Sequence, residues 1–223
     1  MLDKTLLNYA NLMNFQKDAN LTGQDYSWLG TIFYLGYLAG TPVHALCLHH
    51  LPLSPYISTV IVVWGVVLAC HAACNDFSSF MACRFLLGFF EGAINPGFIL
   101  LTGRFYRRQE QVIRVAVWYS MNGWAMVVGG LMTYGIIAQP SPYLLMWKEM
   151  FVAVGCATVG FGFFCLLVMP SSPASTKYLS PRQRSVAVSR IVSNQSGIHD
   201  THFKLSQLKE AFLGKSAYDS SLH

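Results

Sequence analysis

The sequence predicts an all-α protein that crosses a membrane several times. Of its 223 residues, 53% are hydrophobic and only 11% are charged, whereas a soluble domain usually has about a quarter charged residues. The apolar residues come in blocks of about 20, the length that a helix needs to cross a hydrocarbon core. Lys and Arg concentrate in two segments between and after these blocks, as in cytosolic loops.

Five of these blocks are long enough to be complete membrane spans. Their predicted positions are about 28–48, 56–75, 78–102, 113–137 and 148–169. A shorter block at residues 2–14 precedes them and gives way to the polar segment QKDANLTGQDY. About twelve helical residues cover only about 18 Å of a roughly 30 Å hydrocarbon core, so we expect the first of six helices to be incomplete.

The distribution of positive charge predicts the orientation in the membrane. Outside the blocks or at their ends, eleven Lys and Arg residues fall on one side and two on the other. The eleven are Arg104, Arg107, Arg108, Arg114, Lys177, Arg182, Arg184, Arg190, Lys204, Lys209 and Lys215, and the two are Lys17 and Lys148. Residues 103–114 and 170–223 are therefore predicted to be cytosolic, in a multi-pass protein of the plasma membrane. The net charge of +5 then reflects topology, and we expect a lipid bilayer but no nucleic acid as partner.

Two regions follow from this pattern. Residues 1–169 are predicted to form a transmembrane bundle, and residues 170–223 a cytosolic linker with short amphipathic helices. Ser180-Pro181 opens the first of these helices, because Pro is favoured in a first helical turn. Residues 205–213 are the candidate for another. The alternative is a solvated linker that lies against the membrane surface.

The six cysteines lie in or at the edges of the apolar blocks, where a thiol behaves as a small hydrophobe. The segment Cys70-His71-x-x-Cys74 contains potential metal ligands. A structural metal site needs a second ligand pair, and none accompanies this one in the sequence. Packing is therefore the favoured interpretation, and we predict no metal, no cofactor and no disulfide framework.

Two charged residues lie inside the third predicted span, in the segment CRFLLGFFEGAINPG. Arg84 and Glu91 are seven positions apart, so they share one helix face at about 10 Å along the axis. Each charge in a span costs about 2.5–3.5 kcal/mol on insertion scales, so this face should point to a polar cavity or to partners. Asp3 and Lys4 in the first helix are the expected partners, since they fall at a similar depth.

Two carboxylates and two cations at one depth favour a proton-coupled site for an anion. A buried carboxylate can change its protonation state when a neighbouring cation engages a substrate. Asn8 lies about one and a half turns outward of Asp3 and is a further candidate contact. The alternative is a structural ion-pair network that locks two helices together.

Two further polar residues in the spans are candidates for substrate contact. Asn122, beside Gly123 in the fifth helix, is expected to face a cavity because an amide in hydrocarbon needs a partner. An interhelical hydrogen bond is an equal alternative for this amide. For Tyr34 in the second helix, a position in the core and a position in the lining of a cavity are both open.

A family resemblance is carried by segments that run over nearly the whole chain. They are Asp3-Lys4-Thr5 with Asn8-Tyr9-Ala10, YSWLGTIFYLGYL, CRFLLGFFEGAINPGF, YSMNGWA and PSSPASTKYLSPRQR. These segments resemble the allantoate permease group of fungal transporters, which belongs to the anion:cation symporter family of the major facilitator superfamily. The motif around Arg84, together with the first-helix Asp-Lys pair, is the most specific part of the resemblance.

The resemblance implies a major facilitator fold, of which this chain holds the six-helix N-terminal bundle and lacks the C-terminal six-helix bundle. It implies proton-coupled symport of a small organic anion, such as allantoate, ureidosuccinate or a vitamin-like carboxylate. By motif, Asp3 and Glu91 would carry protons, while Lys4 and Arg84 would hold the substrate carboxylate. The missing bundle is then an expected partner.

The chain also departs from the family pattern. CLHHLPLSP stands where the superfamily has an acidic and basic signature, and family members have about twelve spans. A lone bundle has nothing to rock against, so the alternative is a truncated fragment that does not transport, or an interaction partner of full-length transporters. A membrane enzyme or channel is the third hypothesis. No nucleophile–base pair or phosphate loop in the sequence favours it, so we predict that the chain is not an enzyme.

Overall fold

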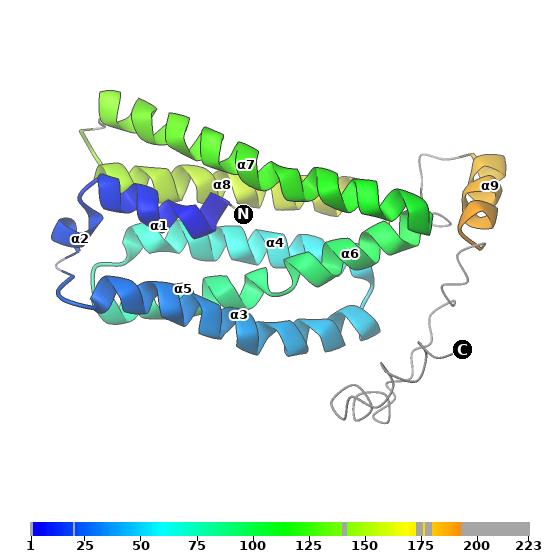
Figure 1. Ribbon diagram of the computed structural model, residues 1–223, viewed down its shortest axis with the longest axis horizontal. Helices are drawn as coiled ribbons and strands as arrows, with labels where there is room; N and C mark the ends of the chain where they lie inside the picture. Colours follow the sequence, from blue (N-terminus) through cyan, green and yellow to red (C-terminus); the bar gives the residue numbers. More distant parts are fainter. Residues whose placement is uncertain (1, 20, 140–141, 173–175, 177–179, 193–223) are drawn as a thin grey trace, which may run out of the picture.

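The chain is described here from a computed structural model, in which the described residues are 2–19, 21–139, 142–172, 176 and 180–192. Within these ranges the chain forms helices joined by turns, without a strand. Figure 1 shows most of the helices side by side along one direction, with α9 across one end of the bundle. An all-helical bundle is the fold class that the composition predicts.

The first half of the chain contains two short helices followed by two long ones. Their bounds are α1 Leu2–Leu12, α2 Phe15–Asp18, α3 Asp25–His50 and α4 Leu53–Cys70. The chain turns between α1 and α2 at Asn14, whose φ of 63° is in the left-handed region that Asn tolerates better than most residues. α4 continues into a 3₁₀ turn at His71–Ala73.

The second half contains α5 Phe77–Glu91, α6 Ile94–Phe105, α7 Arg108–Ala138, α8 Met146–Val168 and α9 Pro181–Val192. Five segments of the described residues are long and apolar enough to cross a membrane: α3, α4 with its 3₁₀ turn, α5 with α6, α7, and α8. They coincide with the five apolar blocks of the sequence. α9 begins in the segment where an amphipathic helix is expected, and residues 205–213 lie outside the described residues.

The third membrane span differs from its prediction, because it consists of two helices. The sequence predicts a continuous helix over 78–102, but α5 ends at Glu91 and α6 begins at Ile94. Pro96 explains the break: a continuous helix would need its N–H to donate to the carbonyl of Gly92, and Pro has no N–H. Pro96 lies in the first turn of α6, where a missing N–H leaves no hydrogen bond unmade.

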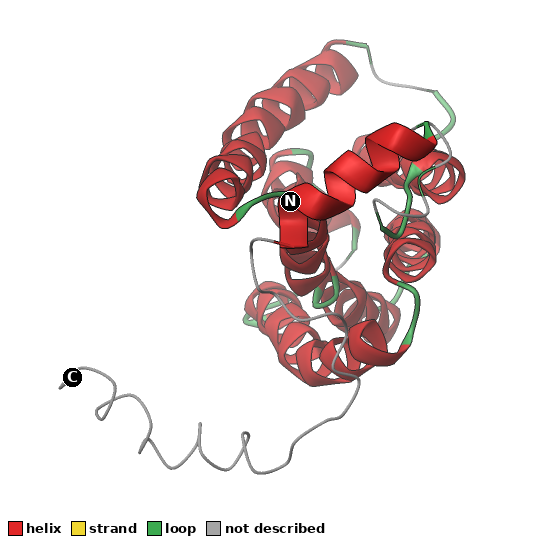
Figure 2. Cartoon of the chain, turned by 90° about the vertical axis from the view of Figure 1, so that its right-hand side faces the viewer, coloured by secondary structure: helices red, strands yellow, loops and turns green. Residues whose placement is uncertain are grey.

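Two helix pairs form the centre of the bundle. α3 packs along α5, and α4 packs along α8. In the α3–α5 pair, a Cβ atom added at Gly36, Gly40 or Gly88 would collide with a backbone carbonyl of the other helix. Glycines of this kind let two backbones approach closely, and close packing is the main source of helix association in a membrane. Figure 2 looks along the bundle and shows most of the helices end-on, packed around one another.

An aromatic cluster joins α2, α5 and α8 at the end of the bundle that is predicted to be external. The Phe15 ring lies 5.3 Å from that of Phe80 and 5.0 Å from that of Trp147, both edge to face. Phe151 extends the cluster along α8, and none of these four side chains is more than 1% exposed. α1 precedes this cluster and contacts both α7 and α8. The chain directly after α1 is therefore packed against α5 and α8.

We expect Gly88→Ala to destabilise the bundle, because the added Cβ would collide with the backbone carbonyl of Phe33. Overpacking of this kind costs about 1–3 kcal/mol. Thermal unfolding of the purified protein in detergent should show a fall in Tm of at least about 3 °C. Gly130→Ala on α7 is the matched control, since nothing lies within 4 Å of its added Cβ. Equal Tm values for the two variants would contradict this account of the packing.

Candidate functional site

Arg84 and Glu91 are the charged side chains with the least exposure in the described part of the chain, 3% each. Both belong to α5, and Glu91 is its last residue. Glu91 is also the middle residue of the 29-residue span that α5 and α6 form together. Both charges therefore lie inside the bundle rather than on its lipid-facing surface, and Glu91 lies as far as this span allows from water on either side.

Arg84 lies where three helices meet. Its guanidinium carbon is 5.9 Å from the centre of the Phe151 ring of α8, and it acts electrostatically on the hydroxyl of Tyr26 of α3. The Tyr26 hydroxyl lies 3.1 Å from Oδ1 of Asn8 and 3.4 Å from the carbonyl oxygen of Leu7, so it can donate to either acceptor on α1. Tyr26 thereby joins α3 to the first helix.

Glu91 lies at the break between α5 and α6, and α3 packs against the residues on both sides of it. A Cβ atom added at Gly92, directly after Glu91, would lie 3.0 Å from the backbone nitrogen of Thr41. Beyond the break, Nδ2 of Asn95 donates a hydrogen bond of 3.1 Å to the hydroxyl of Tyr37. The backbone that carries the Glu91 carboxylate is therefore held by α3.

The first helix contributes backbone and one amide to this region. Asp3 and Lys4 belong to α1, but their side chains lie outside the described residues. Their pairing with Arg84 and Glu91 stays a prediction. Asn8, on the same helix, is exposed and accepts a hydrogen bond from Tyr26, as described above.

The other two candidate residues lie in different surroundings. Tyr34 on α3 is 65% exposed, with its ring edge to face against Phe33. It does not share the buried position of Arg84 and Glu91. Asn122 on α7 is half-buried. A substrate contact at either position stays a prediction.

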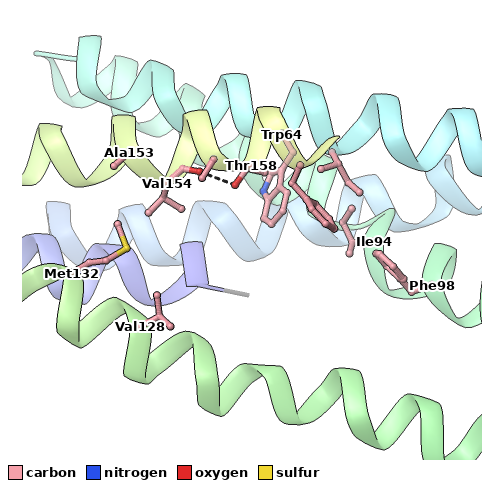
Figure 3. A pocket seen from close by; sticks show the side chains of 11 residues that line it. Trp64, Ile94, Phe98, Val128, Met132, Ala153, Val154 and Thr158 are labelled. Carbon is pink, nitrogen blue, oxygen red and sulfur yellow. Dashed lines mark hydrogen bonds between the residues drawn. The ribbon is translucent and has the colours of Figure 1, made fainter. Parts of the chain in front are cut away.

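An apolar cavity of about 410 Å³ lies between α4, α6, α7 and α8, and Figure 3 shows the side chains that line it. Trp64, Phe98 and Phe161 are its aromatic lining residues. The hydroxyl of Thr158 also faces it, but donates a hydrogen bond of 2.8 Å to the carbonyl of Val154. No charged side chain belongs to the lining, so the cavity suits an apolar group rather than an anion.

Comparison with known proteins identifies the family. Residues 1–217 match the Major Facilitator Superfamily, which is nearly the whole chain. The chain belongs to the Major Facilitator Superfamily. The predicted superfamily and its all-helical fold are therefore confirmed, and the chain is a multi-pass membrane chain of a transporter family.

Individual members of the superfamily agree with this assignment. The chain is 40% identical over 212 residues to the uncharacterized transporter C417.10 of Schizosaccharomyces pombe, covering 95% of this chain and 42% of that protein. It is 39% identical over 212 residues to the thiamine pathway transporter THI73 of Saccharomyces cerevisiae, covering 95% of this chain and 40% of that protein. The allantoate permease of the same yeast is 33% identical over 214 residues, covering 94% and 39%. The expected resemblance to fungal allantoate permeases is thus confirmed, and the chain spans about two fifths of the length of these relatives.

Tyr26 and His44 each join helices of this bundle, but neither is among the site residues predicted from the sequence. Tyr26 lies just before the second predicted span and looked like part of a loop. His44 lies inside that span, where an ionisable residue is a functional candidate by default, so its position alone was a sufficient signal.

The cysteine segment after α4 is arranged for packing. Sγ of Cys74 lies 3.5 Å from Sγ of Cys83 and 3.4 Å from the carbonyl oxygen of Cys70. The His71 ring stacks on that of Phe151, with 5.1 Å between the ring centres. Among the described residues, no group of three His, Cys, Asp or Glu side chains is placed to share a metal ion. Burial, together with the hydrogen bond to Cys83, raises the pKa of the Cys74 thiol to about 12.

We expect Cys74 to react slowly with a water-soluble maleimide at pH 8. With a pKa of about 12, only about one thiol in ten thousand is ionised at this pH, and the thiolate is the nucleophile. Peptide mass spectrometry on a variant that retains Cys74 together with its partner Cys83 measures the rate at Cys74. The matched control retains only a cysteine at the exposed neighbouring position, Asn75→Cys, and should react at least about a hundredfold faster. Similar rates would contradict the burial of this thiol.

Proposed function

We propose that this chain is one bundle of a permease that takes up a small organic anion together with protons. The observation that supports the proposal best is the burial of Arg84 and Glu91 near the middle of the third membrane span. Charges cost several kcal/mol at this depth, about 2.5–3.5 kcal/mol each on insertion scales, and in membrane spans they mark substrate and proton pathways. A cation and a carboxylate in one bundle supply both groups that anion–proton symport requires.

In this proposal Arg84 holds the carboxylate of the substrate. A guanidinium keeps its charge at any physiological pH and presents its donors as a planar fork that matches a carboxylate. The Phe151 ring, 5.9 Å from the guanidinium carbon, restricts its orientation. A restricted guanidinium loses less entropy when it binds an anion than a freely rotating one.

Glu91 is the proposed proton carrier. It lies about 10 Å from Arg84 along α5, and at low dielectric two charges still influence each other over that distance. Protonation of Glu91 removes a negative charge that opposes the entry of an anion beside Arg84. Substrate binding and proton binding are then favourable together, which is the requirement for symport.

The remaining candidates are proposed to complete the site from three helices. Asp3 would be a second proton carrier and Lys4 a second cation, both on α1. Asn8 would add a polar contact to the same region, since Tyr26 joins it to α3. Asn122 and Tyr34 would contact the substrate from α7 and α3.

The proposed substrates are allantoate, ureidosuccinate or a vitamin-like carboxylate. The relatives include an allantoate permease and a high affinity cysteine transporter, and both named compounds contain a carboxylate. The proposed location is the plasma membrane, with residues 170–223 in the cytosol. The proposed partner is a second bundle, because the relatives are more than twice as long as this chain and alternating access needs two halves around one site.

We expect Glu91→Gln to abolish accumulation driven by a pH gradient while exchange continues. The glutamine cannot carry a proton, whereas exchange of labelled for unlabelled substrate needs no net proton movement. Arg84→Leu should reduce both accumulation and exchange by about 10- to 100-fold, because a hydrogen-bonded charge pair contributes about 1.5–3 kcal/mol. The measurement is uptake of radiolabelled carboxylates, with and without a protonophore, by cells that lack endogenous uptake.

Glu149→Gln on α8 is the matched control for these variants. It makes the same chemical change at the start of another membrane span, and it should accumulate substrate at the wild-type rate. If Glu91→Gln and Arg84→Leu both accumulate labelled substrate as the wild type does, the proposed roles of the two residues are wrong. If the wild-type protein accumulates none of the carboxylates when the second bundle of a relative is expressed with it, the proposed substrate class is wrong.

A further inference from the structure

His44 of α3 joins three helices in the interior of the bundle. It is 3% exposed. Its Nδ1 lies 2.6 Å from the hydroxyl oxygen of Tyr56 on α4, and its Nε2 lies 2.9 Å from the carbonyl oxygen of Phe89 on α5. The ring also packs against that of Phe89, with 4.9 Å between the two centres. Both nitrogens of this buried imidazole are therefore engaged.

The partners of His44 determine where its proton lies. A carbonyl oxygen can only accept, so Nε2 carries a hydrogen and donates it to Phe89. In the neutral ring, Nδ1 is then an acceptor, and the hydroxyl of Tyr56 donates to it. The neutral ring thus satisfies all three polar groups without a charge inside the membrane.

The carbonyl that His44 reaches is one that the helix break disturbs. In a continuous helix, the N–H of Ala93 would donate to the carbonyl of Phe89. Here the N–H of Ala93 donates to Phe90 instead, at 3.2 Å, and the N–H of Gly92 is divided between Gly88 at 3.1 Å and Phe89 at 3.2 Å. The Phe89 carbonyl thus loses its helix donor, Ala93, and keeps only the hydrogen bond that Gly92 shares with Gly88. Inside a membrane span no water can replace the lost donor, and His44 supplies a second one.

Other residues of α3 also pack closely against the α5–α6 break. Gly40, one turn before His44, leaves room for the backbone of Phe89, because a Cβ atom there would collide with its carbonyl. On the far side of the break, the Tyr37 hydroxyl accepts the hydrogen bond from Asn95. α3 thus makes a hydrogen bond before and after the short segment that includes Glu91.

We propose that His44 is a positioning residue for Glu91: its hydrogen bond to Phe89 holds the α5–α6 break and thereby sets the place of the carboxylate two residues further on. This inference rests on the proposed function, in which Glu91 carries the proton. An apolar residue of similar size would fill the same space without burying a polar ring. The hydrogen bond to the Phe89 carbonyl therefore explains why a histidine stands at this position. That carbonyl belongs to the turn that leads into Glu91.

The first test is transport by His44→Leu and His44→Gln variants of the full chain. Leucine fills the space but cannot donate, and its maximal rate of proton-coupled uptake should fall about tenfold, the equivalent of one lost hydrogen bond to a buried group. The KM should change less than about twofold, because Arg84 lies before the break and keeps its place. Glutamine can still donate to Phe89 and should restore at least about half of the rate.

The second test does not depend on transport. Hydrogen–deuterium exchange of the purified protein in detergent reports on the amides of residues 92–97, and His44→Leu should raise their exchange rate about tenfold. His44→Gln and Glu91→Gln should leave this rate unchanged. His50→Leu, at the exposed end of the same helix, is the matched control for the substitution itself.

The two tests separate the inference from the proposed function. If Glu91→Gln transports normally but His44→Leu still accelerates exchange at residues 92–97, the proposed function fails and only the structural part of the inference stands. If His44→Leu changes neither the maximal rate nor the exchange, His44 does not position Glu91. If His44→Leu does not fold, His44→Met, whose flexible side chain fills the space without a donor for the Phe89 carbonyl, is measured in its place. Wild-type exchange and turnover in that variant would overturn the inference.

Discussion

Inside a membrane span, a polar group must find its partner within the protein, because hydrocarbon offers none. The third span is subject to this constraint more than the others, since it buries two charges and also breaks at its middle. Neighbouring helices meet the requirement. α3 supplies a histidine and a tyrosine to the backbone and amide around the break, and α8 places an aromatic ring under the cation. The arrangement of these helices around the third span follows from the need of its polar groups for partners.

Close backbone contact between α3 and α5 makes these hydrogen bonds possible. Glycines on both helices remove the side chains that would otherwise hold the backbones apart. A short imidazole can then reach a main-chain carbonyl on the neighbouring helix. α7 is different: many of its large apolar side chains, such as Trp124, Leu131 and Tyr134, are more than 60% exposed. That face is suited to lipid or to a second bundle, whereas the α3–α5 pair is a fixed unit of this one.

The charges and the apolar cavity are separate features of the bundle. Arg84 and Glu91 do not line the cavity, and the cavity lining holds no charge. A fold of this kind serves many substrates, since function depends on the groups that line the site rather than on the architecture. The names of the relatives agree with this, because an allantoate permease, a thiamine pathway transporter and a high affinity cysteine transporter are all similar to this chain. Under the proposed function, substrate choice would depend on individual side chains around the buried pair.

Composition and periodicity alone determined that the chain is a helical membrane protein, because a helix of about 20 apolar residues has the length that crosses a hydrocarbon core. They also identified Arg84 and Glu91, since a charge in such a block is costly wherever it points. Pro96 carried the signal for the helix break, although a search for continuous apolar length passes over it. The partners could not be predicted in this way: His44 meets Phe89, 45 residues away, and Tyr26 meets Asn8, 18 residues away. Only the tertiary structure decided these contacts. Helix pairing depends on how whole helix surfaces pack together, and a local sequence pattern does not contain that information.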